Sequence, residues 1–170
     1  DSTPPTVAGV SSTNPNGTYG VEDNLTLSVR FSEPVTVSGT PRLKLETGVL
    51  DRSARYVSGS GTDNLSFSYT VQPGDNSSDL DYHSTSALEL NGGTLKDNAS
   101  NNANLSLPAP GSTGSLSANK NLVIDTQPLT LSELSVSTTN AGTTITLTFS
   151  KAVLAGSGTI YIRSSDGTLI

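Results

Sequence analysis

A strict two-residue alternation of apolar and polar side chains is the strongest constraint on how this chain folds. It runs through residues 24–32, and it recurs through residues 63–72. Successive side chains of an extended strand point to opposite faces of a sheet, so this pattern buries one face and exposes the other. The sequence therefore predicts antiparallel strands that share a one-sided core.

Shorter segments of the same character occur throughout residues 1–125. Further strands are expected at residues 7–11, 34–37, 42–46, 54–58, 87–90, 104–107 and 120–125. Turn-forming pairs such as Asn16-Gly17 and Asn91-Gly92 separate them. No convincing helix is found, and the nearest candidate is one short turn at residues 84–90. Strands this short and numerous predict an all-β fold, an immunoglobulin-like antiparallel β-sandwich.

The predicted core comes from the apolar positions of these strands, since only 32% of the chain is hydrophobic and it contains neither Cys nor Trp. The residues expected in it are Leu25, Leu27, Val29, Phe31, Leu43, Leu45, Leu65, Phe67, Tyr69, Val71, Leu88, Leu90, Leu122 and Ile124. Fully burying each side chain contributes roughly 1.5–3 kcal/mol, which is enough for a stable domain.

The opening of the chain is repeated further along. The prolines of residues 1–5 return at residues 125–128, and Phe31-Ser-Glu-Pro-Val35 aligns without a gap with Phe149-Ser-Lys-Ala-Val153. An internal period of domain size is typical of a tandem array. We therefore expect a complete β-sandwich over residues 1–125 and an incomplete second Ig-like unit over residues 126–170.

The second unit offers only three candidate strands, at residues 129–136, 143–149 and 158–163. Three strands cannot close a sandwich, so one apolar face needs a partner. The residues expected on that assembly face are Leu131, Ile145, Leu147 and Phe149. Cover could come from the first domain, from a neighbouring molecule, or from another subunit that adds a strand.

Charge and composition narrow the class of partner. The net charge is −6, which argues against nucleic acid and anionic membrane surfaces. No stretch is apolar enough to span a membrane, which argues against direct membrane insertion. The absence of Cys excludes disulfides and thiolate metal sites. No signal peptide is present at Asp1, so we expect a piece of a longer protein.

Several motifs give the chain a family resemblance. They are Asp1-Ser-Thr-Pro-Pro5, Phe31-Ser-Glu-Pro-Val35, Tyr56-Val-Ser-Gly-Ser-Gly-Thr62, Tyr69-Thr-Val-Gln-Pro-Gly-Asp75, Leu95-Lys-Asp-Asn98, Leu122-Val-Ile-Asp125, Gly158-Thr-Ile-Tyr-Ile162 and Ser165-Asp-Gly167. In their order and spacing the chain resembles the bacterial Ig-like repeats of large cell-surface proteins, including adhesins with cadherin-like or calcium-dependent arrays. The resemblance implies an extracellular, non-catalytic spacer or stalk whose neighbours are similar repeats. Many relatives stiffen their linkers with calcium.

Calcium is the leading hypothesis for a bound cofactor, because Ca²⁺ takes six to eight oxygen ligands from carboxylates, amides and carbonyls. If the interstrand loops meet at the linker, one group of acidic and amide side chains converges there. That group is Asp1, Glu22, Asp23, Asp97, Asn98 and Asp125. The alternative is that these side chains form ordinary turns by bonding their own backbone.

A second acidic group, Asp75, Asp79 and Asp81, is the densest in the chain. It lacks the spacing and the terminal Glu of an EF-hand, which favours a loop ordered by its own turns over a second metal site. Paired carboxylates without aromatic sugar platforms are weak support for a glycosidase. His83 is the single histidine, and no nucleophile elbow accompanies it, so an enzyme is the least favoured reading.

The sequence therefore favours a structural module that acts as a spacer or shaft in adhesion. One alternative is a filament subunit in which a neighbouring, identical subunit completes the second unit with a strand. Another is a carbohydrate-binding module for surface glycans, with exposed tyrosines as stacking platforms. The tyrosines considered for that role are Tyr19, Tyr56, Tyr82 and Tyr161.

Overall fold

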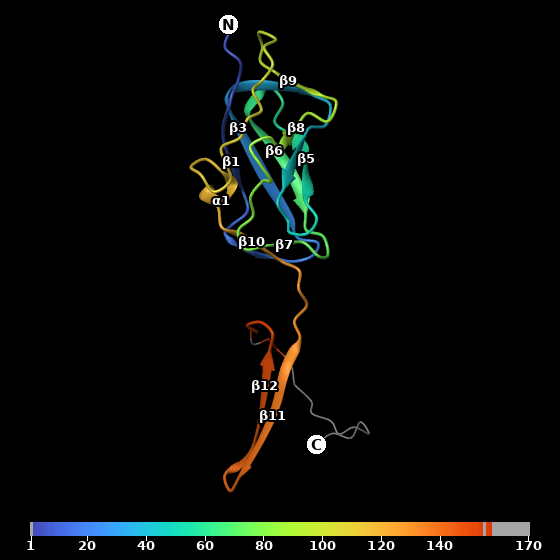
Figure 1. The fold of residues 1–170 in the computed structure, drawn as a ribbon, viewed down its shortest axis with the longest axis vertical. Helices are drawn as coiled ribbons and strands as arrows, with labels where there is room; N and C mark the ends of the chain where they lie inside the picture. Colours follow the sequence, from blue (N-terminus) through green and yellow to red (C-terminus); the bar gives the residue numbers. More distant parts are fainter. Residues whose placement is uncertain (1, 155, 158–170) are drawn as a thin grey trace. The chain divides into compact units, whose positions relative to one another are not determined.

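A computed structural model describes residues 2–154, 156 and 157 and divides the chain into two compact units, Asp1–Gln127 and Pro128–Ile170. The first unit holds the strands β1 (Val7–Ser12), β2 (Gly17–Tyr19), β3 (Asn24–Ser38), β4 (Arg42–Leu45), β5 (Arg52–Ser58), β6 (Thr62–Thr70), β7 (Asn76–Ser77), β8 (Leu88–Glu89), β9 (Thr94–Lys96) and β10 (Leu122–Asp125), and the helix α1 (Leu116–Asn119). The second holds β11 (Leu131–Thr139) and β12 (Gly142–Phe149) (Figure 1). Within the described residues, no helix has the length and apolar character needed to cross a bilayer.

The larger sheet of the first unit has seven strands in the order β1-β3-β6-β5-β4-β8, with β9 paired to the far end of β3. Its centre is the alternating pair predicted from the sequence, in which Leu25, Leu27 and Val29 stand opposite Tyr69, Phe67 and Leu65. All six of these side chains are buried, since each lies at the inward phase of its strand.

β3 joins two predicted strands into one. Residues 24–32 and 34–37 form a continuous strand because the β3–β6 ladder shifts register between Arg30 and Val35. Pro34 lies in that irregular stretch, where a missing backbone N–H breaks no regular pairing. Beyond it, Thr36 to Ser38 pair with β9, so β3 exchanges one partner for another along its length.

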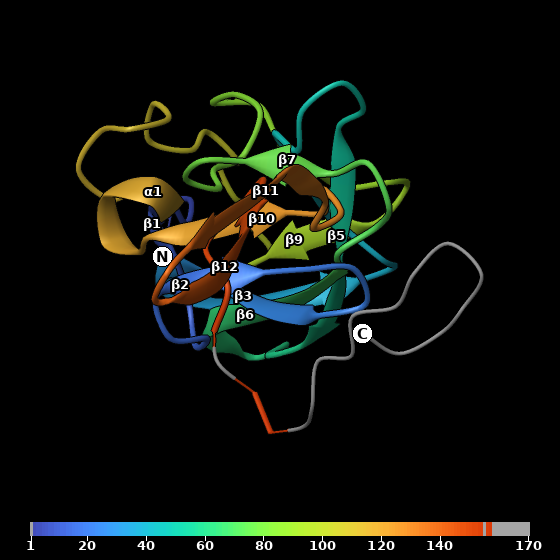
Figure 2. The same ribbon diagram turned by 90° about the horizontal axis from the view of Figure 1, so that it is seen from below.

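The smaller sheet has the order β2-β10-β7, and Figure 2 shows β10 between its two neighbours. β10 runs parallel to β2, with Leu122 opposite Gly17 and Ile124 opposite Tyr19, and antiparallel to β7. Leu122 and Ile124 enter the same buried cluster as the inward residues of β3 and β6. The all-β, Ig-like sandwich predicted from the sequence is confirmed.

The core agrees closely with the predicted one. Thirteen of the fourteen predicted side chains are buried, and Leu90 is half-buried against them. The core also takes in residues outside the predicted list, from the shorter predicted strands and from irregular segments. These are Val10, Val35, Ala54, Leu80, Tyr82, Ala87, Leu95, Leu107 and Leu116.

Two local predictions differ from the structure. Residues 104–107 form no strand, although Asn104 makes a single bridge to Thr6. Residues 84–90 agree with the prediction, since they hold one turn, closed by Ala87 N–H on the Ser84 carbonyl, and then the short strand β8. The helix that does form, α1, begins at Ser115, whose side chain accepts a hydrogen bond from Ala118 N–H.

The first unit has two well-separated ends. At one end, Asn104 N–H bonds the Pro5 carbonyl beside the start of β1, and β9 pairs with the last residues of β3. At the other end lie the start of β3 and the end of β10 (Figure 1). The chain therefore enters the unit at one end and leaves at the other.

The described part of the second unit is a single hairpin. β11 and β12 pair antiparallel from Leu131↔Phe149 to Thr139↔Gly142, and the register shifts between Leu131 and Glu133. The predicted strand at residues 158–163, and the motifs at residues 158–162 and 165–167, lie outside the described residues.

Candidate functional site

The structure does not bring the six predicted calcium residues together. Glu22 and Asp23 precede β3, and Asp125 ends β10 at the same end of the unit, where Gly20 approaches the Asp125 carbonyl. Asp97 and Asn98 follow β9, which pairs with the opposite end of β3. Asp1 lies outside the described residues. The expected convergence does not occur, because the long strand β3 separates the two groups.

At the first of these ends the acidic side chains order their own loop. Glu22 has φ of 72° and its N–H bonds the Val71 carbonyl. The Asp23 carboxylate accepts a hydrogen bond from Gly20 N–H at 2.8 Å. This is the turn-forming role that Asp commonly takes before a strand.

Asp97 is held by its own loop as well. Its two carboxylate oxygens accept hydrogen bonds from the backbone and side chain of Asn101 at 2.8 and 2.7 Å. Desolvation alone would raise the pKa of Asp97, but hydrogen bonds from Asn101 and Ala99 outweigh it and hold that pKa below its ordinary value. The neighbouring Asn98 is exposed beside a shallow hollow that Glu33 and Pro34 also line.

Asp75, one of the three residues considered as a possible second metal loop, is a buried carboxylate, 1% exposed. It accepts hydrogen bonds from Arg52 Nε at 2.8 Å, Tyr69 OH at 2.6 Å and Gln72 N–H at 2.9 Å. Burial, together with the hydrogen bond and negative charge of Asp75, raises the pKa of Tyr69 far above its ordinary value. The carboxylate joins the end of β6 to the start of β5.

Asp81 belongs to a separate network. One oxygen accepts from Tyr82 N–H, and the other accepts from Gly111 N–H at 3.0 Å and Ser117 Oγ at 2.6 Å. This ties α1 and its preceding loop to the centre of the unit. Asp79 is exposed. The three predicted ligands therefore serve different segments, and protein donors already occupy the oxygens of the two that are buried.

The tyrosines considered as sugar platforms are packed into the fold. Tyr82 is 1% exposed, and its hydroxyl bonds the Pro108 carbonyl. Tyr56 is half-buried with its ring edge-on to Phe67 at 5.9 Å, and its hydroxyl accepts from Ser60 N–H. Tyr19 is half-buried and donates to the Pro15 carbonyl. Tyr161 lies outside the described residues. None of the other three is fully exposed.

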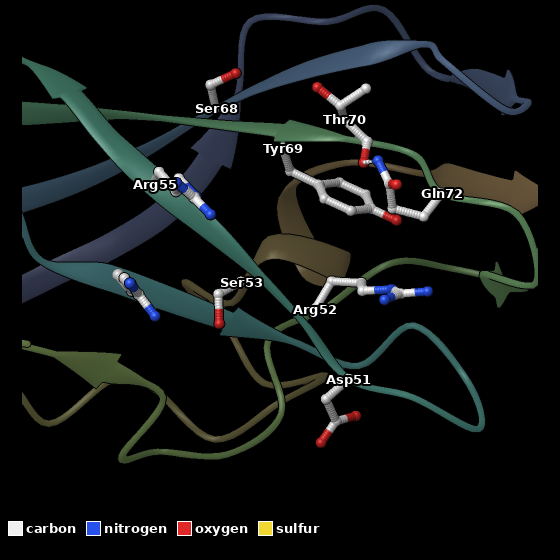
Figure 3. A pocket seen from close by; sticks show the side chains of 9 residues that line it. Asp51, Arg52, Ser53, Arg55, Ser68, Tyr69, Thr70 and Gln72 are labelled. Atoms are coloured by element: carbon white, nitrogen blue, oxygen red, sulfur yellow. Dashed lines mark hydrogen bonds between the residues drawn. The ribbon is translucent and has the colours of Figure 1, made fainter.

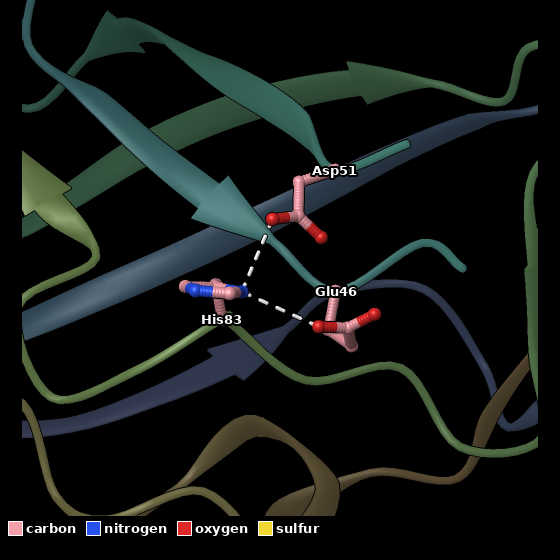
Figure 4. Close-up of side chains that lie close together, drawn as sticks. All are labelled: Glu46, Asp51 and His83. Carbon is pink, nitrogen blue, oxygen red and sulfur yellow. Dashed lines mark hydrogen bonds and ion pairs between the residues drawn. The ribbon is translucent and has the colours of Figure 1, made fainter. Parts of the chain in front are cut away.

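One convergence of ionisable groups escaped the sequence analysis. Among the described residues, one group of three side chains could hold a metal ion: Glu46, Asp51 and His83 (Figure 4). Their ligand atoms lie within 4.8 Å of one another. His83 Nδ1 lies 3.1 Å from Asp51 Oδ2 and 3.3 Å from Glu46 Oε2. Lys44 Nζ also contacts Asp51 Oδ2 at 3.0 Å, so an ammonium already compensates this carboxylate. The group arises where the β4–β5 ladder ends at Leu45↔Arg52, a register that the sequence does not display.

The residues of the predicted assembly face do lie together. Leu131 stands opposite Phe149, Leu134 opposite Leu147, and Val136 opposite Ile145. Cross-strand partners share one face of a hairpin. Leu131 is 51% exposed and Leu147 is 37% exposed, while Phe149 is half-buried.

The hairpin β11–β12 reproduces the pairing of β1 with β3. Val7↔Phe31, Val10↔Val29 and Ser12↔Leu27 become Leu131↔Phe149, Leu134↔Leu147 and Val136↔Ile145, and the register shift falls at the same step. The closing hydrogen bonds recur too. Ser32 N–H bonds the Thr6 carbonyl and Ser150 N–H bonds the Thr130 carbonyl, both at 2.8 Å, and in each case the serine hydroxyl accepts a bond in return at 3.0 Å.

Comparison with known proteins gives one match. The family model described as "Bacterial Ig-like domain" matches residues 1–113, which is most of the first unit and more than half of the chain. No curated protein and no solved structure gives a significant match.

Proposed function

Because the chain belongs to the bacterial Ig-like domain family, whose members are generally structural modules of bacterial surface proteins, we propose that it is a non-catalytic spacer in an adhesive shaft built from tandem copies. The observation that carries the tandem part is the repeated strand pair. Two segments far apart in sequence share their register, their bulge and their closing hydrogen bonds. Such agreement is expected of two copies of one domain.

The spacer role is supported by how the first unit would carry tension. The chain enters near Pro5 and leaves after Asp125 at the opposite end, so tension runs along the strands. Five residue pairs join β1 to β3, and three parallel residue pairs join β10 to β2. Ladder hydrogen bonds lie across the strands, so tension along them loads several bonds in shear at once.

Force spectroscopy tests this role. The chain contains no Cys, so pairs of cysteine handles can be introduced without competition. Handles at Ser2 and Gln127 pull along the strands. Handles at Val49 and Gln127 pull from one end only, because Gly48 contacts Asn76 of β7 beside Asp125.

We expect the lengthwise pair of handles to require a severalfold higher unfolding force than the one-ended pair. Shear breaks the β1–β3 and β2–β10 bonds together, whereas one-ended pulling opens bonds one by one. Equal forces in the two geometries would contradict a shaft that resists tension.

The exposed face of the second hairpin supports a second candidate, a filament subunit. Leu134 and Val136 are 59% and 61% exposed, and β12 has no second neighbour among the described strands. Cover by another copy predicts reversible self-association that Leu134→Lys abolishes and Thr146→Lys, on the opposite face, preserves. Sedimentation that shows only monomer at high concentration would contradict the filament candidate. It would not affect the proposed role as a spacer.

A further inference from the structure

A surface hollow of about 490 Å³ lies over β4, β5 and β6, and three arginines line it. Figure 3 shows the side chains around it. The whole chain has only nine Lys and Arg and a net charge of −6, so three guanidinium groups around one hollow run against its overall charge. The three are Arg42, Arg52 and Arg55.

The sheet register sets two of these cations against each other. Arg42 and Arg55 are direct partners in the β4–β5 ladder. The next pair, Leu43 with Ala54, faces the core, so both arginines lie on the outer face. Like charges directly opposite each other destabilise a sheet. Packing of the sheet does not require this pair.

The charge on these two arginines is uncompensated at close range. Glu89 stands opposite Arg42 on its other side, but no ion pair forms within 4.0 Å there. Among the described residues, neither the Arg42 nor the Arg55 guanidinium has a hydrogen-bond or ion-pair partner. Asp51, the one acidic group lining the hollow, is already in contact with Lys44 and His83. The hollow therefore offers guanidinium donors with no internal acceptor.

The third arginine is fixed in place. Arg52 Nε is bound to the buried Asp75, which Tyr69 OH and Gln72 N–H also hold. Its terminal nitrogens make no hydrogen bond in the described part of the chain. A guanidinium held through Nε presents its remaining donors in a fixed orientation, which suits a carboxylate or sulfate group.

The remaining lining indicates what else the ligand carries. Ser53 adds a hydroxyl group, and Ser68 and Thr70 add hydroxyl groups that also bond the side chain of Asn24. The one aromatic ring, that of Tyr69, is 3% exposed. A peptide would find no apolar subsite for its side chains, whereas a sugar acid matches both the guanidinium groups and the hydroxyls. We propose that the hollow lined by Arg42, Arg52 and Arg55 binds the carboxylate or sulfate group of an acidic polysaccharide. This is independent of the shaft, and it uses none of the tyrosines.

Calorimetry on the whole chain at physiological ionic strength tests the proposal with three oligosaccharides. An oligogalacturonate carries carboxylates, a carrageenan oligosaccharide carries sulfates, and a cello-oligosaccharide is neutral. We expect binding of at least one charged oligosaccharide and none of the neutral one, and the charged one that binds identifies the anionic group. Failure of both charged oligosaccharides to bind would overturn the proposal.

Charge-matched variants separate a site from general attraction. Arg42→Gln and Arg55→Gln should each weaken binding about tenfold, as loss of a charge-assisted hydrogen bond does. Arg55→Lys keeps the charge and should give an intermediate loss, because the planar fork is gone. Arg30→Gln is the control. Arg30 lies on β3, outside the hollow, and pairs with Asp63 of β6. An equal loss in Arg30→Gln would overturn the proposal.

Stability gives a second readout. Arg55→Gln removes one of two like charges that stand opposite each other in the sheet. Its melting temperature should therefore be unchanged or raised, while its affinity for the ligand falls. A purely structural arginine would instead lower the melting temperature, so a marked fall would contradict the assignment of this pair to ligand binding.

Discussion

The strand pairs β1–β3 and β11–β12 have the same local structure and opposite surroundings. Register, bulge and closing hydrogen bonds agree in both. Yet Val29 and Phe31 are at most 1% exposed, whereas the equivalent Leu147 is 37% exposed. The comparison teaches that alternation and turn chemistry are sufficient to specify how two strands pair. The apolar face of the pair is buried only when other elements pack on it. In the first unit these elements are β6, β10 and the loops on the same face.

The largest expected effect comes from truncating the equivalent phenylalanines. Phe31→Ala should destabilise the first unit by about 3–5 kcal/mol, because it leaves a cavity in a fully buried core. Phe149→Ala should leave the main unfolding transition unchanged, because Phe149 has no equivalent cover among the described residues. Urea denaturation followed by circular dichroism measures both. A comparable loss in Phe149→Ala would show that its face is covered after all.

A second contrast concerns buried carboxylates, which among the described residues occur only in the first unit. Asp75→Ala should cost about 3 kcal/mol, because it leaves Arg52 and the hydroxyl of Tyr69 without their acceptor. Asp63→Ala removes the carboxylate of the exposed Arg30 pair and should cost below about 1 kcal/mol. Thermal unfolding of the two variants compares them. Similar shifts would mean that the Asp75 network contributes no more than a surface ion pair.

The smallest effect is alkaline destabilisation confined to the first unit. Burial raises the pKa of Tyr69 and of Tyr82, so in the folded state both stay protonated above pH 10. A raised pKa gives a contribution that is complete below the ordinary value of 10.0 and is lost as the pH rises above it. The loss approaches about 1.4 kcal/mol per pH unit for each tyrosine.

Tyr82→Phe should reduce the slope of the unfolding free energy against pH, because phenylalanine does not ionise. Unfolding monitored by tyrosine absorbance between pH 9 and 11 measures the slope. An identical slope in wild type and Tyr82→Phe would assign the alkaline loss to other groups.

Much of the fold was predictable because it rests on local alternation. The β3–β6 pair and thirteen core positions follow directly from period two. Leu80, Tyr82 and Leu116 were not predicted, because they lie in irregular segments and are buried only by where the chain crosses the core. Their burial is a property of the tertiary fold, which no short window of sequence contains.

The candidate sites were less predictable, because they depend on which strand ends meet. Asp97 was grouped with Glu22 and Asp23 because their loops were expected to meet at the linker, but its strand β9 pairs with the far end of β3. The opposition of Arg42 and Arg55 needs the β4–β5 register, which the intervening loop sets. Asp75 and Asp81 were grouped by their closeness in sequence, but their carboxylates accept hydrogen bonds from different segments of the fold.

The parallel pairing of β10 with β2 has a consequence for synthesis. The strand that closes the core is the last of the first unit to be made, and its partner at Gly17 is among the first. The buried cluster lacks Leu122 and Ile124 until that strand is available. Because contacts so distant in sequence cannot form on a partial chain, we expect the nascent unit to stay unfolded until residue 125 has left the ribosome, and then to fold in a single cooperative step.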